Sequence, residues 1–441
     1  MKHKLKSATV YFLAVIFTGI QALQAQDNVR TITLKEAIDL SITNSHLLKN
    51  NIAKINEATA AIKEANERRL PDVSVTGSYI YLPIQPNVNL KSDTTGGGFA
   101  GPRLTQAAYG FVNASVPIYT GGKLKYGIES AKYLEQAAKL DADVNRDAVI
   151  LNTINAYINL YKAKAAAALV KENLQQSNQR VKDFTNLEKN GLVARNDLLK
   201  VSLQTSNIEL ALLDAESNYK LAGINMAVML GLPEQTIINT DVASLQLTGP
   251  IKTMDEYEQL ALLERKDIGA LALHKKAADL GIKTAKADYY PNLAVTMGYI
   301  GIELPNFLSI NNALTVGAGL KYNLSSLWKT KSKIQQAEAR VQQLSASQDM
   351  LNDNIRLQIN QAYQEYLLSQ KKIEVYQKAV EQATENYRIT KNKYDNALAT
   401  TTDLLDADLA QLQSKLNVSN ATADAVVSYN KLLQTAGILN N

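Results

Sequence analysis

An internal duplication constrains this chain more than any other feature. The segment RRLPDVSVTGSYIY at 68–81 matches DYYPNLAVTMGYIG at 288–301, an offset of 220 positions. Further along the chain the offset becomes 206, so that Asp197 corresponds to Asp403. Self-similarity over a long period is the signature of a fold built from repeated structural units. The sequence therefore predicts two similar halves.

The N-terminus has the layout of a secretory signal peptide. Lysines at positions 2, 4 and 6 precede an apolar run that ends in small residues before Gln26. This order predicts cleavage after Ala25. A retained anchor is the alternative, but the apolar run is short against the roughly 20 residues of a membrane span. We expect a signal peptide at 1–25, a first repeat at 26–250 and a second repeat at 251–441.

Each repeat is predicted to contain a helix, two strands, a long helix, a turn and a returning helix. The first helix is expected at about 35–69 and again at about 255–289, where a proline ends the helical pattern. The long helical runs at 123–189 and 329–395 carry apolar or small residues at three- and four-residue steps. Such a narrow seam is typical of coiled coils. A soluble coiled-coil protein would explain the helices equally well.

Four short segments alternate apolar and polar side chains, as strands with one apolar face do. Their apolar positions are Val73, Val75, Tyr79 and Tyr81; Val112, Ala114, Val116 and Ile118; Leu293, Val295, Met297 and Tyr299; and Ala318, Leu320, Tyr322 and Leu324. A strand tilted across a bilayer needs about 9–11 residues, and each segment is about that long. Tyrosines near the strand ends suit a boundary between hydrocarbon and water. An amphipathic sheet over a soluble core has the same period, so that reading remains open.

The number of strands bears on the oligomeric state. An outer-membrane barrel needs at least about eight strands, because an open edge in lipid leaves backbone groups unpaired. Two chains of four strands would give a barrel filled by its own side chains, whereas three chains would give a lumen. The pattern therefore favours a trimer if the strands form a membrane pore.

Composition excludes several other functions. The chain has no cysteine, so it offers no thiol for lipid attachment, no disulfide and no thiolate metal site. Its formal net charge of +5 falls to about +2 without the predicted signal peptide, which argues against nucleic acid as a partner. His46 and His274 each stand alone on a predicted helix, and no nucleophile–base pair is visible. We expect no catalytic site, no metal site and no cofactor.

Four stretches of the chain together match a known pattern: LKEAIDLSITNSHLLKNNIAKINEATAAIKEANERRLPDVSVTGSY, LLERKDIGALALHKKAADLGIKTAKADYYPNLAVTMGY, SVPIYTGGKLKYGIESAK and the turn NGLVARNDLL. On these stretches the sequence resembles the TolC family of outer-membrane efflux proteins. The resemblance implies an α+β membrane protein: four strands per chain in a trimeric 12-stranded outer-membrane β-barrel, continued by a long periplasmic α-helical barrel. It also implies a homotrimer in the bacterial outer membrane, in contact with lipid. The expected partners are a periplasmic adaptor and an inner-membrane pump or ABC transporter.

In that arrangement the turns of the two hairpins form the periplasmic tips. Gly191 suits the left-handed residue that closes a helix, and the corresponding position holds Ala397, where the family commonly has glycine. Asn196 and Thr402 are good N-caps for the returning helices. We expect the tip residues to contact the adaptor: Gly191, Leu192, Asn196, Ala397 and Thr402.

Charge distinguishes the two tips. Residues 188–200 carry a net charge of +1, and residues 394–408 carry −4. Asp403 and Asp406 lie one turn apart, and in a trimer they would form a ring of six carboxylates that favours cations. By resemblance both match the acidic entrance positions of the family, while Tyr394 and Asp197 match residues of its closing network. Because Ala399 replaces a basic residue of that network, we expect Arg195 or Lys200 to supply the counter-charge.

Two other functions remain open. A periplasmic adaptor of the membrane-fusion type also presents a long helical hairpin, but it should have one hairpin flanked by compact β-domains. A structural coiled-coil envelope protein would leave the four strands unexplained. The sequence therefore favours an outer-membrane channel that exports small molecules or proteins and is gated at its helical tips.

Overall fold

The computed structural model describes residues 29–84, 105–241, 251–305 and 308–439. The predicted signal peptide at 1–25 lies outside these residues. The chain forms two compact units, and each unit draws on both predicted repeats. One unit comprises residues 1–49, 143–265 and 353–441, and the other comprises residues 50–142 and 266–352.

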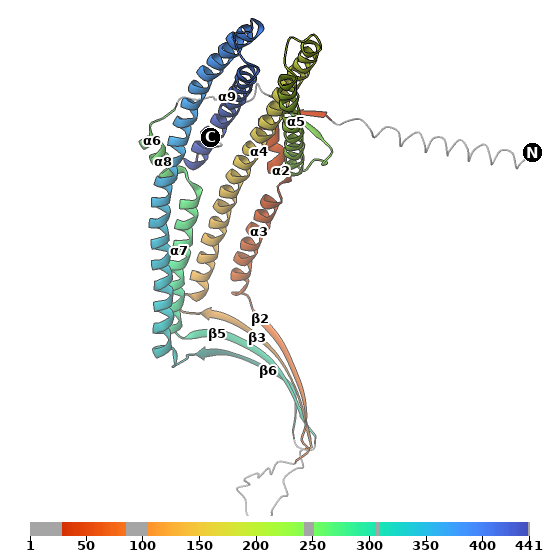
Figure 1. Cartoon of the computed structure of the whole chain (residues 1–441). Coiled ribbons are helices and arrows are strands. Elements are labelled where there is room, and N and C mark those ends of the chain that lie inside the picture. Colours follow the sequence, from red (N-terminus) through yellow and green to blue (C-terminus); the bar gives the residue numbers. More distant parts are fainter. Residues whose placement is uncertain (1–28, 85–104, 242–250, 306–307, 440–441) are drawn as a thin grey trace, which may run out of the picture. The chain divides into compact units, whose positions relative to one another are not determined.

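The same order of elements occurs twice along the chain (Figure 1). The first series is α2 (Leu34–Asn44), α3 (His46–Glu67), β2 (Asp72–Tyr81), β3 (Gln106–Tyr119), α4 (Lys123–Lys189) and α5 (Arg195–Leu230). The second is α6 (Met254–Glu264), α7 (Lys266–Lys286) with η3 (Ala287–Tyr289), β5 (Asn292–Leu304), β6 (Leu308–Lys321), α8 (Ser326–Asp395) and α9 (Thr401–Thr435). Two short strands, β1 (Val29–Ile32) and β4 (Ile237–Thr240), complete the fold.

The prediction of one continuous first helix in each repeat was wrong. The helix breaks at Ser45 in the first series and at Arg265 in the second, although neither break contains proline or glycine. A left-handed glycine lies against each break, and its missing Cβ makes the close approach possible. A Cβ on Gly231 would lie 2.9 Å from Asn44 Cβ, and a Cβ on Gly437 would lie 2.9 Å from the Arg265 nitrogen. The breaks are therefore set by tertiary packing, which a helical period does not report.

The four predicted strands form one antiparallel sheet in the order β2-β3-β5-β6. Its register aligns the apolar positions of all four strands on one face: Val73, Ala114, Met297 and Val316 in one row, and Val75, Val112, Tyr299 and Leu314 in the next. The opposite face carries polar rows such as Ser74, Asn113, Gly298 and Thr315. The predicted alternation therefore holds across all four strands in these rows, whereas the opposite face also carries the largely apolar row of Thr76, Phe111, Ile300 and Ala313.

The prediction for the fourth strand was wrong at its end. The strand β6 stops at Lys321, so Tyr322 and Leu324 lie in the connection to α8 instead of in the sheet. Asn323 causes the stop, because its side-chain oxygen accepts from the Ser325 nitrogen at 3.2 Å and turns the backbone. The strands β3 and β5 are longer than the sequence predicted.

A small parallel sheet of β1 and β4 was missed by the sequence reading. It lies beside the main core of its unit, where Tyr157, Leu160, Met226 and Leu230 are buried with Ile32 and Ile238. The Tyr157 hydroxyl donates to the Ile32 carbonyl at 2.7 Å and accepts from the Asp241 nitrogen at 2.8 Å. These bonds tie both short strands to α4.

The long helices of this unit pack against one another, with α4 in contact with α5, α9 and α8, and α5 also in contact with α9. The Ser177 and Thr205 hydroxyls, 2.7 Å apart, join α4 to α5, and those of Ser369 and Ser428, 2.9 Å apart, join α8 to α9. An apolar cluster joins α4 to α9: Ile150, Ile154, Ile158, Ala423 and Val426.

Among the described residues, none of the helices is both long and apolar enough to cross a membrane.

Candidate functional site

Both hairpin tips end their first helix with the same backbone motif. After α4, the Gly191 nitrogen donates to the Glu188 carbonyl and the Leu192 nitrogen donates to the Leu187 carbonyl, both at 2.9 Å. Gly191 has a φ of 70° and satisfies the helix end in a Schellman motif. After α8 the motif recurs with Ala397 at a φ of 60°. The second tip therefore keeps the left-handed position with a residue that is strained there.

The predicted N-caps were wrong at both tips. The N-caps are Ala194 and Thr400, so Asn196 and Thr402 lie inside the first turn of the returning helices. The left-handed residue reverses the chain so tightly that each returning helix begins two residues earlier than the sequence suggested. Ala194 makes no side-chain cap bond, whereas Thr400 forms a capping box with Asp403. The two tips thus differ in the strength of their caps.

Asp403 has a structural role as well as a charge. Its Oδ2 accepts from the Thr400 nitrogen at 2.9 Å and from the Thr400 hydroxyl at 2.7 Å, while its own nitrogen donates to that hydroxyl at 3.2 Å. These bonds lower the pKa of Asp403 from its ordinary value. The carboxylate is fixed at the start of α9, and its charge there also complements the helix dipole.

Counting charges overstated the acidity of the second tip. Asp395 accepts from the Lys391 ammonium at 3.0 Å, and Asp408 is buried with Arg180. Asp406 is exposed, and it forms no ion pair within the described part of the chain. The carboxylates of Asp403 and Asp406 therefore remain as the exposed charge of this tip.

The two bases expected to supply a counter-charge lie within the first hairpin. Arg195 Nη1 lies 3.9 Å from Glu188 Oε1, and Lys200 Nζ lies 3.7 Å from Asp197 Oδ1. The Arg195 side chain is 80% exposed. Exposed ion pairs with N···O separations as large as these contribute little to stability. Both bases can therefore exchange these partners for others at low cost.

Tyr394 connects the two hairpins. Its ring stacks on Phe184 of α4 with centroids 5.6 Å apart and an angle of 14° between the planes. Burial raises the pKa of Tyr394; a hydrogen bond with Thr401 opposes this, and the charge of Asp197 adds to it. The structure thus brings Tyr394, Asp197 and Thr401 together, from α8, α5 and α9.

A buried polar cluster behind the tips was missed by the sequence reading. Arg180 on α4 donates to Asp408 Oδ2 at 3.0 Å and to the Tyr387 hydroxyl at 3.3 Å, and Asn173 donates to the same carboxylate oxygen at 3.4 Å. Burial lowers the pKa of Arg180, but its bond to Asp408 and the charge of that residue outweigh burial and raise it. The available signal was the loss of apolar residues from the α4 seam at Asn173, Ser177 and Arg180.

Comparison with known proteins identifies the family. The outer membrane efflux protein family matches residues 37–232 and 258–438, one match in each half of the chain. This chain belongs to that family. It is similar to the cation efflux system protein CusC of Escherichia coli K12, with 24% identity over 364 residues that cover 76% of this chain and 74% of CusC. It is also similar to the outer membrane protein TolC of Vibrio cholerae, with 22% identity over 432 residues, 92% of this chain and 91% of that protein.

The fold agrees with this identification. The solved structure of VceC, an outer membrane protein of Vibrio cholerae, aligns with a TM-score of 0.74 and 21% identity over 92% of this chain and 96% of VceC. Membership of the outer membrane efflux protein family locates this chain in the outer membrane, from which it extends into the periplasm. Its family consists of channels that are not enzymes, and the described residues contain no group of three or more His, Asp or Glu placed to hold a metal ion.

Proposed function

We propose that this efflux protein is a homotrimeric exit duct. It carries small molecules or proteins from the periplasm, or from an inner-membrane transporter, to the exterior. The four-stranded sheet carries this proposal, because β2 and β6 are its edges. Edge backbone groups cannot stay unpaired in lipid, so β6 of one chain must pair with β2 of the next. Three chains close about twelve strands around a lumen, and each of the repeats at 26–250 and 251–441 contributes two strands and one hairpin.

Exposed apolar stripes on two of the long helices support a ring of chains. Both α5 and α8 expose apolar side chains at spacings close to the heptad of a coiled coil. These side chains are Leu203, Leu210, Leu213 and Leu221 on α5, and Leu357, Leu368, Val375 and Ile389 on α8. In a closed ring, α5 of one chain meets α8 of its neighbour, and the two stripes bury each other. The result is a periplasmic α-helical barrel continuous with the β-barrel.

Cysteine cross-linking tests this assembly, because the chain has no cysteine of its own. Leu221 lies 26 residues after the start of α5, and Leu368 lies 27 residues before the end of α8, so antiparallel packing puts them at the same level. The double variant Leu221→Cys/Leu368→Cys should give covalent dimers and trimers on oxidation in membranes. Either single variant is the control. A double variant that stays monomeric would refute the ring.

We infer that the channel is a passive pore gated at its tips. Three copies of Asp403 and Asp406 would place six carboxylates around the pore axis. Such a ring favours cations and can gate a narrow entrance. Arg195 or Lys200 would hold the closed state by pairing with the neighbouring acidic tip. Tyr394 and Asp197 would couple the hairpins, since each lies where both hairpins meet.

Single-channel recording tests the gate. Because Asp403 also caps α9, Asp406→Asn alone is the cleaner change. It should reduce cation preference and block by divalent cations, and the double variant with Asp403→Asn should reduce them further. Asp424→Asn, an exposed change on the same helix, is the matched control. If Asp406→Asn conducts and selects as the unaltered protein does, the carboxylate ring is not the gate.

The tips also present the surface proposed to contact a periplasmic adaptor and, through it, an inner-membrane pump or ABC transporter. Leu192 and Leu398, at equivalent positions, are 70% and 77% exposed. Gly191, Asn196, Ala397 and Thr402 flank them. CusC is described as part of a cation efflux system, and an acidic entrance would suit cations here as well. The adaptor function itself is not favoured, because both halves of the chain match the channel family.

A further inference from the structure

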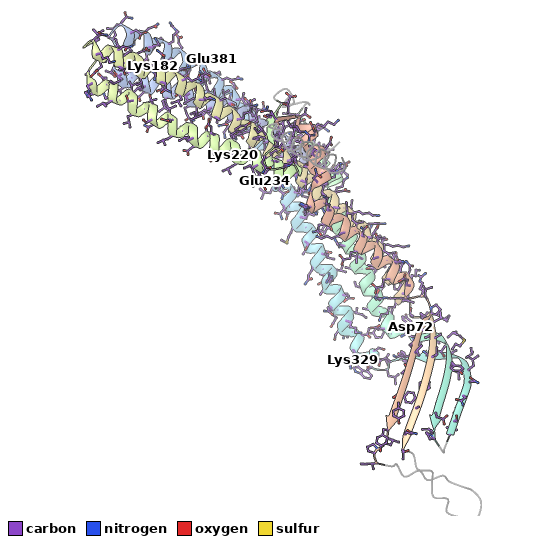
Figure 2. All side chains as sticks on the ribbon, turned by 90° about the vertical axis from the view of Figure 1, so that its right-hand side faces the viewer. Asp72, Lys182, Lys220, Glu234, Lys329 and Glu381 are labelled. Atoms are coloured by element: carbon purple, nitrogen blue, oxygen red, sulfur yellow. The ribbon has the colours of Figure 1, made fainter. Side chains whose placement is uncertain are left out.

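Along the junction between β6 and α8, an exposed apolar strand face is followed by exposed aromatic and basic residues. The strand exposes an apolar face at Leu314, Val316 and Leu320. The connection and the first turn of the helix expose Tyr322, Leu324, Leu327 and Trp328, and the Trp328 side chain is among the most exposed at 65%. Lys329, Lys331 and Lys333 follow at once, and all three are exposed. Figure 2 shows Lys329 where α8 leaves the sheet.

The first repeat has the same order at the junction between β3 and α4. Ile118 and Tyr119 are exposed at the end of the strand, at 66% and 42%. Lys123 and Lys125 follow at the start of the helix, and both are exposed. At the offset of 206 they correspond to Lys329 and Lys331. Two separate junctions of one chain therefore present lysines at equivalent positions of the duplication, each after an apolar strand.

Local acids neutralise only part of this charge. Asp288 accepts from Lys333 at 2.8 Å and from Lys123 at 2.9 Å, so that one carboxylate serves two ammonium groups. Lys125, Lys329 and Lys331 form no ion pair with any residue that the structure describes. Asp72 at the start of β2 and Glu129 on α4 are two further acids of the same unit. The junctions keep a net positive charge.

We propose that Lys125, Lys329 and Lys331, together with Trp328, form a belt that binds anionic phospholipid headgroups in the periplasmic leaflet. This inference rests on the proposed function, in which the sheet crosses the outer membrane. Tryptophan is favoured at the headgroup level, and lysine extends its alkyl chain along apolar surface while its ammonium reaches a phosphate. A zwitterionic headgroup carries its own positive charge and satisfies these lysines less well. The belt therefore discriminates by lipid charge.

Trp328 reports directly on this belt, because it is the chain's only tryptophan. The full-length protein is reconstituted in bilayers of phosphatidylcholine with a fixed fraction of phosphatidylglycerol. The brominated acyl chain, a quencher of tryptophan fluorescence, is placed on one lipid or on the other. At equal mole fraction, brominated phosphatidylglycerol should quench Trp328 more strongly. A lysine near an anionic surface corresponds to about a fivefold preference, which rising salt should weaken.

The variant Lys329→Gln/Lys331→Gln should abolish the excess quenching while keeping quenching by both lipids. Its matched control is Lys371→Gln/Lys372→Gln, two exposed lysines further along α8, which should behave as the unaltered protein. Equal quenching by the two lipids in the unaltered protein, or a preference that survives in Lys329→Gln/Lys331→Gln, would overturn the lipid belt. Absence of quenching by either lipid would instead refute insertion of the sheet, and with it the proposed function.

Discussion

The buried pair of Arg180 and Asp408 gives the sharpest test of what holds the two hairpins together. Their side chains are only 10% and 4% exposed, and the bond between them joins α4 to α9. Removing one partner of a buried ion pair leaves an uncompensated charge and costs about 3–5 kcal/mol. We expect Asp408→Ala to lower the free energy of unfolding by that amount, because only the Tyr387 hydroxyl would remain for Arg180.

Replacing both partners should cost far less than replacing one. In the double variant Arg180→Met/Asp408→Leu no charge is buried, and apolar substitutes of similar volume are often neutral or stabilising. The matched control is Lys162 and Asp424, a pair between the same two helices with N···O at 2.7 Å and side chains 26% and 58% exposed. Its loss through Asp424→Ala should cost under about 1 kcal/mol.

Urea titration of the helical circular dichroism signal in detergent measures all four proteins. The expected ranking of destabilisation is Asp408→Ala first, then the control and the double variant close together. The reasoning fails if Asp408→Ala costs no more than Asp424→Ala, or if the double variant is as unstable as Asp408→Ala. Either result would mean that the cluster is hydrated in the assembled protein and does not fasten the hairpins.

Three further predictions concern single positions. Ala397→Gly should stabilise the protein by about 1 kcal/mol in the same titration, because it relieves a left-handed alanine, and a loss of stability would contradict this. Gly437→Ala should lower the thermal midpoint more than Gly231→Ala, because its Cβ would meet backbone at 2.9 Å and not a side chain; equal effects would contradict the packing argument. The folded-state pKa of Asp403 lies below its ordinary 3.8, so the capping bonds with Thr400 stabilise fully above that value and are lost as the pH falls through the folded pKa. The stability difference between the unaltered protein and Asp403→Asn should therefore shrink on acidification, and a difference that is constant with pH would refute this role.

Periodicity along the sequence predicted the strands, because their side chains alternate between two faces. The alternation at Val73 and Val75, and its repeat at Leu293 and Val295, located the strands and their apolar face. The duplication also marked Gly191 and Ala397 as equivalent positions, and the structure gives both the same left-handed conformation. The backbone conformation at these two positions therefore follows the place in the repeat, although one residue is glycine and the other alanine.

The remaining features depend on residues far apart in the sequence. Arg180 and Asp408 are 228 positions apart, and each looks like an ordinary polar residue on its own helix. The breaks at Ser45 and Arg265 contain no helix-breaking residue, and each lies against a glycine that follows the end of another helix, Gly231 after α5 and Gly437 after α9. Each strand of the small parallel sheet has four residues, too few for an alternation of apolar and polar residues to be recognised.

The antiparallel pairing of the sheet bears on what sets the number of subunits in the proposed assembly. The joint between β3 and β5, where the two halves meet, is antiparallel, as are the joints within each half. A joint between β6 and β2 of another chain would be of that kind too, so strand pairing alone would accept a ring of any size. The number of subunits would then be set by the curvature of the proposed α-helical barrel. In the proposed ring, substitutions on α5 and α8 would therefore change how many copies assemble, whereas substitutions at the sheet edges would change whether the ring closes at all.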